Sequence, residues 1–132
     1  MRRHVSLELA ADPTGVDEAA RGVVALLDSV PPDVAFVCEL AVVEVCANIV
    51  RHASGAPGGR MRVVARASGR RVAIAICDTA PAFEGSAPPM PPADAESGRG
   101  LPLVFACMDR VRWQRINGEN RLLMVRRLDT CS

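Results

Sequence analysis

Glu44 and Asn48 lie one helical turn apart in the segment 39–53, which is otherwise largely apolar. At about 100° per residue, they share a narrow stripe with Arg51 and His52, while apolar side chains cover most of the remaining circumference. A carboxylate in such a helix costs free energy unless an ion, a ligand or water meets it. The spacing therefore predicts a buried helix whose polar stripe faces a cleft. A solvated polar strip explains this one helix equally well.

Two further motifs follow in chain order. Asp78 ends an apolar segment, and Gly98 and Gly100 then open another apolar segment of helical length. Glycine lets the backbone approach a phosphate closely, and a helix N-terminus presents free N–H groups and a positive dipole end to an anion. The glycine motif therefore suggests a phosphate site. It also favours the interpretation that the polar stripe of the segment 39–53 faces a cleft.

The E-x-x-x-N helix, the strand-end Asp and the Gly-x-Gly-Leu start resemble, in this order, the ATP-binding fold of histidine kinases, type II topoisomerases and mismatch-repair ATPases. A closer resemblance is to the small bacterial anti-sigma-factor serine/threonine kinases of the stress-response and sporulation type. It covers residues 3–128 and rests on the motifs EVCANIVRHA, DTAPAF, GRGLPLV and DRVRWQRINGENRLLMVRRL.

The resemblance implies an ATP- and Mg²⁺-dependent site. Asn48 would bind Mg²⁺ through its side-chain oxygen, because this cation takes oxygen ligands. Glu44 would be the catalytic base, which must lie within hydrogen-bond reach of the attacking hydroxyl. Asp78 would select adenine by accepting a hydrogen bond from its exocyclic amine. The remaining nucleotide contacts implied by the resemblance are Ala80, Ser97, Gly98, Arg99, Gly100 and Leu101.

Two of these residues depart from the family pattern, and a third has an alternative interpretation. Ala80 and Ser97 stand where relatives usually have glycine. The methyl group of Ala80 could crowd the base, and Ser97 could stiffen a hinge. Neither change removes a group assigned to catalysis. Arg99 could contact the phosphates or could simply be an exposed charge.

Periodicity predicts the elements that must position these residues. Alternation of apolar and polar side chains, together with Asn-Gly and Ser-Gly turns, predicts strands at 4–10, 60–67, 72–77, 111–115 and 121–127. Apolar residues at helical spacing predict helices at 14–27, at 33–53 and after Gly100. Thr14, followed three residues later by Asp17, is the expected N-cap of the helix at 14–27. The expected fold is an α/β (α+β) two-layer sandwich, with a mixed, mainly antiparallel sheet and helices on one face.

Residues 79–98 contain half of the ten prolines and show no periodicity. A compact domain seldom keeps about 20 structureless residues unless they form a lid or binding loop or are disordered. By the resemblance, this segment is the ATP lid of a single domain that spans residues 1–132.

The composition excludes several classes of protein. A net charge of +1 argues against a nucleic-acid-binding protein, and the arginines between Arg60 and Arg71 are interpreted as a solvated strand face. No apolar run reaches the roughly 18 residues of a membrane span, and the N-terminus lacks a secretory apolar segment, so we expect a cytoplasmic protein. The five cysteines show no C-x-x-C spacing. Four of them, Cys38, Cys46, Cys77 and Cys107, are expected to be reduced core residues.

The leading hypothesis is a serine/threonine kinase that binds a sigma factor or another regulator and phosphorylates an anti-sigma-factor antagonist. A non-catalytic nucleotide-binding module that acts by docking alone is the main alternative, and Ala80 keeps it open. An ATPase clamp fits less well, because the chain lacks the transducer domain of such machines. The first strand offers an open edge for homodimer formation.

Overall fold

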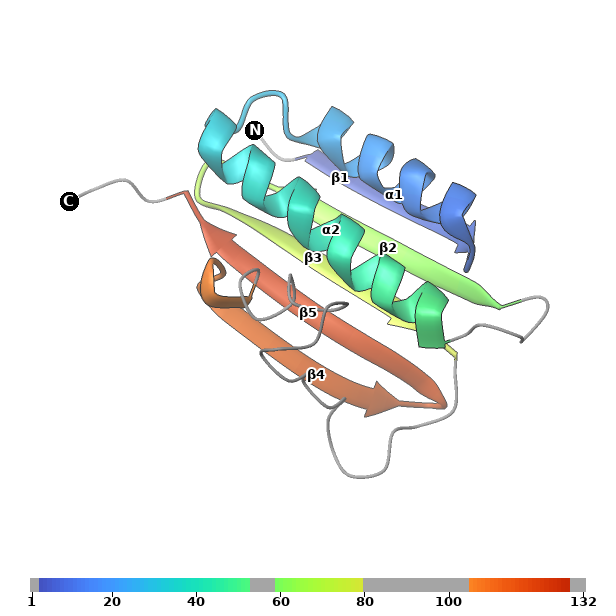
Figure 1. Cartoon of the computed structure of the whole chain (residues 1–132). Coiled ribbons are helices and arrows are strands. Elements are labelled where there is room, and N and C mark those ends of the chain that lie inside the picture. Colours follow the sequence, from blue (N-terminus) through green and yellow to red (C-terminus); the bar gives the residue numbers. More distant parts are fainter. Residues whose placement is uncertain (1–2, 53–58, 80–104, 129–132) are drawn as a thin grey trace.

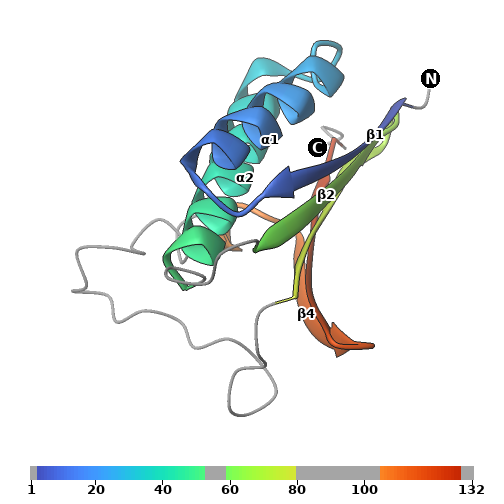
Figure 2. The ribbon, with the colours of Figure 1, turned by 90° about the vertical axis from the view of Figure 1, so that its right-hand side faces the viewer.

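The computed structural model describes residues 3–52, 59–79 and 105–128, with the side chain of His52 excepted. Two helices pack on one face of a five-stranded sheet (Figures 1 and 2). The strands are β1 (Arg3–Ala10), β2 (Arg60–Ala67), β3 (Arg71–Asp78), β4 (Arg110–Ile116) and β5 (Glu119–Arg127), and the helices are α1 (Pro13–Leu26) and α2 (Pro32–His52).

The sheet has the strand order β1-β2-β3-β5-β4, and all four pairings are antiparallel. The predicted two-layer sandwich is therefore confirmed, and no parallel pair occurs among the described strands. β1 lies at one edge of the sheet, as expected, and β4 lies at the other. No helix in the described part of the chain is both long and apolar enough to cross a membrane.

The start of α1 differs from the sequence prediction. Asp12, not Thr14, is the N-cap, and its side chain accepts a hydrogen bond from the Gly15 backbone N–H at 2.8 Å. Pro13 follows as the first helical residue, where its missing N–H is not needed and its fixed φ already suits a helix. A Cβ at Gly15 would collide with the carbonyl oxygen of Ala10, so this glycine lets α1 begin directly against the end of β1.

The hydrophobic core lies between the helices and the sheet. α1 packs on β1 and β2, and α2 packs on β3. Because side chains alternate along each strand, every second residue faces the helices. The fully buried side chains on this face include Met61, Val63, Ile74, Ile76 and Met124, and those of the helices include Val23, Cys38, Val42 and Cys46.

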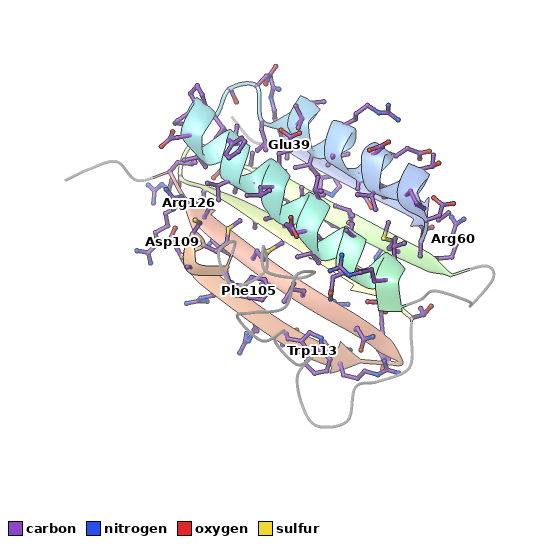
Figure 3. All side chains as sticks on the ribbon, viewed as in Figure 1. Glu39, Arg60, Phe105, Asp109, Trp113 and Arg126 are labelled. Carbon is purple, nitrogen blue, oxygen red and sulfur yellow. The ribbon has the colours of Figure 1, made fainter. Side chains whose placement is uncertain are left out.

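The β4–β5 turn and the segment before β4 complete the sheet. Asn117 and Gly118 both have positive φ, 52° and 77°, which matches the predicted Asn-Gly hairpin turn between β4 and β5. Of the segment predicted to be helical after Gly100, residues 105–109 are described; Phe105 and Ala106 are helical, and residues 107–109 form a turn and bend. The Arg126 guanidinium donates a hydrogen bond to the carbonyl oxygen of Cys107 at 2.7 Å. This bond connects β5, which contains Arg126 (Figure 3), to the turn before β4.

Three of the four cysteines expected to be core residues are buried. Cys38 and Cys46 lie between the helices and the sheet, and Cys77 is buried on the other face of β3, whereas Cys107 is exposed, so the prediction for Cys107 was wrong. Cys107 has apolar neighbours in the sequence, but it lies in a turn at the edge of the sheet and not on the buried face of a helix. Burial raises the pKa of Cys38 to about 11 and that of Cys46 to about 12. Few thiolates therefore form there at neutral pH.

We expect iodoacetamide to modify Cys107 in the native protein and to leave Cys38 and Cys46 unmodified, because the thiolate is the reactive form and both thiols are also shielded. Peptide mass mapping after timed labelling measures this for each residue. Labelling in urea is the control, and all three should then react. Equal native rates at Cys38 and Cys107 would show that the core between α2 and the sheet opens readily.

Candidate nucleotide site

The structure brings the predicted helix stripe and the strand-end aspartate to one end of the molecule. Glu44 and Asn48 lie in the C-terminal half of α2, and Asp78 is the last residue of β3. The C-terminal ends of α2 and β3 lie at the same end of the sandwich (Figures 1 and 2). All three side chains are half-buried. Each can therefore meet a ligand.

Asp78 faces the helix layer because of its place in the strand. Val72, Ile74 and Ile76 point into the core, and Asp78 continues their alternation. It therefore lies on the face that α2 covers. The helix side of the sheet continues beyond β3 with Leu122 of β5 and its register partner Trp113 of β4, both half-buried (Figure 3). This apolar surface next to the carboxylate suits a planar base.

Asn120 and Arg115 form a polar chain with Asp78 that sequence reasoning missed. Asn120 is 3% exposed, and its amide nitrogen donates to Asp78 Oδ1 at 3.0 Å. Arg115 donates to Asn120 Oδ1 at 2.9 Å. Because the arginine engages the amide oxygen, the amide nitrogen must face Asp78. The chain fixes the orientation of the carboxylate.

The only sequence signal for this contact lies in the pattern of β5. Asn120 precedes Leu122 and Met124 at the period of two, so a polar residue occupies a position that should face the core. The pairing of β3 with β5 places Asn120 directly opposite Asp78. That pairing joins strands more than 40 residues apart and is not visible in either motif alone.

Within the part of the chain that the structure describes, the Asn48 side chain forms one hydrogen bond, with Arg51. Its Oδ1 accepts a hydrogen bond from Arg51 Nη2 at 3.3 Å, on the exposed side of α2. The length indicates a weak bond. This contact lies on the exposed side of α2, so the oxygen is accessible. A single protein oxygen is enough for Mg²⁺, which usually takes its other ligands from water and from the phosphates of the substrate. Arg51 occupies one of the two acceptor positions of this oxygen, and its positive charge opposes a cation there.

The other predicted nucleotide contacts lie outside the described residues. These are Ala80, Ser97, Gly98, Arg99, Gly100 and Leu101, and of the predicted lid 79–98 only the exposed Thr79 is described. Their roles remain predictions.

We expect Asn120→Ala to weaken ATP binding and to reduce the preference for ATP over GTP. Loss of one buried hydrogen bond costs about 1–3 kcal/mol, or roughly 5- to 150-fold in Kd if all of it falls on the bound state. Asp78 would no longer be held against the exocyclic amine, and that amine is what distinguishes adenine. Calorimetric titration with each nucleotide measures both effects.

Asp78→Asn is the comparison for this variant, because it removes the acceptor itself and should weaken ATP binding at least as strongly. A general loss of packing would lower ATP and GTP affinity by the same factor. That result in Asn120→Ala would contradict a role in base selection. Unchanged ATP affinity in Asp78→Asn would remove Asp78 from the site.

Residues 9–126 match the family described as the histidine kinase-like ATPase domain, and this range contains Glu44, Asn48, Asp78 and Asn120. No curated protein is similar enough to count as a match. A solved structure of the RsbU and RsbW domains of Rv1364c from Mycobacterium tuberculosis has a similar fold, with a TM-score of 0.70 at 15% identity.

The aligned part covers 95% of this chain and 32% of that one, so this chain spans about a third of its length. The structural likeness agrees with a Bergerat-type ATP-binding fold, with two helices packed on a five-stranded antiparallel sheet. The family match covers most of the sequence, and the chain therefore belongs to the histidine kinase-like ATPase domain family.

Proposed function

We propose that this chain is an ATP- and Mg²⁺-dependent protein serine/threonine kinase that acts as a cytoplasmic anti-sigma factor. It would hold a sigma factor or another regulator and phosphorylate an anti-sigma-factor antagonist, in a partner-switching pathway. The observation that carries the proposal is the placement of Glu44 and Asn48 on α2 at the same end of the sandwich as Asp78, which Asn120 orients. The family match supplies the expectation of ATP binding.

Each residue then has a separate task. Asp78 would accept a hydrogen bond from the exocyclic amine of adenine, and Leu122 would offer an apolar surface beside it. Asn48 supplies an oxygen to the cation that accompanies the phosphates. Bound Mg²⁺-ATP supplies the transferable phosphoryl group, and Glu44 takes the proton from the hydroxyl of the substrate serine or threonine. Phosphoryl transfer demands mainly positioning and charge neutralisation from the protein.

One observation favours the docking-only alternative. Arg51 donates to the Asn48 oxygen that the kinase needs for its cation. If this contact persisted with nucleotide present, the chain could bind its partners without transferring phosphate. Phosphoryl transfer requires Mg²⁺, whereas docking alone does not, so one experiment can distinguish the two functions.

The test uses the purified chain, ATP labelled on its γ-phosphate, Mg²⁺ and the antagonist encoded by a neighbouring gene. We expect label on a serine or threonine of the antagonist and none when Mg²⁺ is replaced by a chelator. The antagonist with that residue changed to alanine is the matched control. Binding of ATP and antagonist without transfer would contradict the kinase and support docking alone.

A further inference from the structure

The sheet face that points away from the helices is strongly basic. Alternation and register place eight arginines and two glutamates on it within the described strands, an excess of six positive charges on a chain whose net charge is +1. The arginines are Arg60, Arg62, Arg66, Arg71, Arg110, Arg112, Arg121 and Arg127. The sequence contains no lysine, so all 16 Lys or Arg positions are arginine, whose side chain can bind a carboxylate through two parallel hydrogen bonds.

Small apolar side chains form the centre of this open face. Val64 of β2, Ala75 of β3 and Leu123 of β5 are register neighbours, and Ala73 pairs with Val125 in the next row. All five are half-buried, although no described helix covers them (Figure 2). An apolar centre with a charged rim and many arginines is the arrangement of a protein–protein interface.

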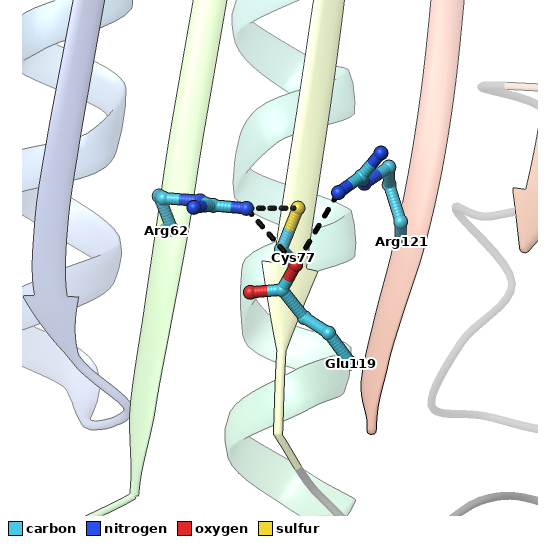
Figure 4. A network of polar contacts seen from close by, with 4 residues as sticks. All are labelled: Arg62, Cys77, Glu119 and Arg121. Atoms are coloured by element: carbon cyan, nitrogen blue, oxygen red, sulfur yellow. Dashed lines mark hydrogen bonds and ion pairs between the residues drawn. The ribbon is translucent and has the colours of Figure 1, made fainter. Parts of the chain in front are cut away.

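The two glutamates of this face, Glu8 and Glu119, lie at one end of it. Glu119 accepts from Arg62 at 2.9 Å and lies 3.5 Å from Arg121 (Figure 4). Arg62 also donates to Cys77 Sγ at 3.7 Å, and together these groups cover the Cys77 thiol. Glu8 is the register partner of Arg62. The charge at this end is therefore partly neutralised.

At the other end of the face, the described strands carry no acidic side chain on this face, and the Asp109 carboxylate accepts a hydrogen bond from the backbone N–H of Arg127 at 2.6 Å. A hollow of about 1330 Å³ lies beside the β2–β3 turn, with Ala73 and the side chains of His4, Arg66, Arg70, Arg71 and Arg127 among its lining. None of the described residues that line it is acidic. Arg66, Arg70, Arg71 and Arg127 are exposed, and none forms an ion pair with a carboxylate in the described part of the chain. This end of β3 is opposite to Asp78, so the hollow is separate from the nucleotide site.

We propose that this open face is a docking surface for an acidic protein segment, which would place carboxylates in the arginine-lined hollow and apolar side chains on the central stripe. A second copy of the chain does not fit, because two faces with the same positive excess would repel each other. Single-stranded nucleic acid fits less well, since sheets that bind it stack bases on aromatic side chains, and no aromatic residue of the described strands points to this face.

The proposal goes beyond the proposed kinase function, because docking here needs neither ATP nor phosphoryl transfer. The test measures binding of a helical, glutamate-rich peptide with a leucine stripe on one face, at low ionic strength. A scrambled peptide of the same composition and a thymidine oligonucleotide are compared with it. We expect the parent chain to bind the striped peptide more tightly than either competitor.

Arg66→Glu and Arg127→Glu should each weaken peptide binding by about 10-fold, because each reverses a charge in the hollow. Arg21→Glu is the matched control, since it makes the same change in net charge on the exposed side of α1, and it should leave peptide binding close to that of the parent. Unchanged thermal unfolding midpoints would show that all three variants fold.

Three results would overturn the proposal. Equal loss in Arg21→Glu would show attraction to the whole chain rather than to this face. Equal binding of the scrambled peptide would show diffuse charge attraction without an apolar contact. Tighter binding of the oligonucleotide, lost in Arg66→Glu, would assign the face to nucleic acid.

Discussion

Glu44→Gln should bind Mg²⁺-ATP nearly as tightly as the parent chain and should lose phosphorylation of the antagonist by about 10²–10⁴-fold, the usual contribution of a general base. Glutamine keeps the shape of the side chain and its place on the polar stripe of α2, but it cannot accept the proton of the attacking hydroxyl. Calorimetry measures the binding, and single-turnover transfer of labelled phosphate measures the chemical step.

Glu39→Gln is the matched control for this change. Glu39 also lies on α2, but it is exposed and stands more than one turn before Glu44 (Figure 3). The same substitution there should leave both nucleotide binding and transfer unchanged. If Glu44→Gln retained full activity on a proper substrate, the assignment of Glu44 as the base would be wrong.

Asn48→Ala should abolish phosphoryl transfer, because it removes the side-chain oxygen that would hold the cation at the phosphates. Asn48→Asp keeps an oxygen at the same position and should retain measurable activity, with a changed dependence on Mg²⁺ concentration. Rates measured across a Mg²⁺ titration distinguish loss of the ligand from damage to the helix. Full activity in Asn48→Ala would remove this residue from the cation site.

Arg51→Ala supplies the control on the same stripe. It removes the hydrogen bond to Asn48 Oδ1 and leaves the oxygen in place. If the Arg51–Asn48 hydrogen bond forms only when no nucleotide is bound, it competes with Mg²⁺ for the oxygen. Arg51→Ala should then need a lower Mg²⁺ concentration for half-maximal transfer. A large loss of activity would instead show that Arg51 takes part in transfer.

The sequence by itself determined the features that depend on neighbours in the chain. The polar stripe of α2 follows from helical spacing, the hairpin between β4 and β5 follows from Asn117-Gly118, and the two-layer sandwich follows from the order of strands and helices. Its errors were also local. The N-cap of α1 is Asp12 and not Thr14, because the Asp12 carboxylate reaches the backbone N–H of Gly15. Cys107 is exposed and not buried.

Tertiary structure alone decided which distant residues meet. The pairing of β3 with β5 places Asn120 beside Asp78, and without it nothing in either strand indicates that Asp78 has a partner. The same pairing gathers arginines from four strands on one face, although the chain as a whole is almost neutral. The physical reason is that register across a sheet joins segments far apart in sequence, and a shift of one residue would send each side chain to the opposite face.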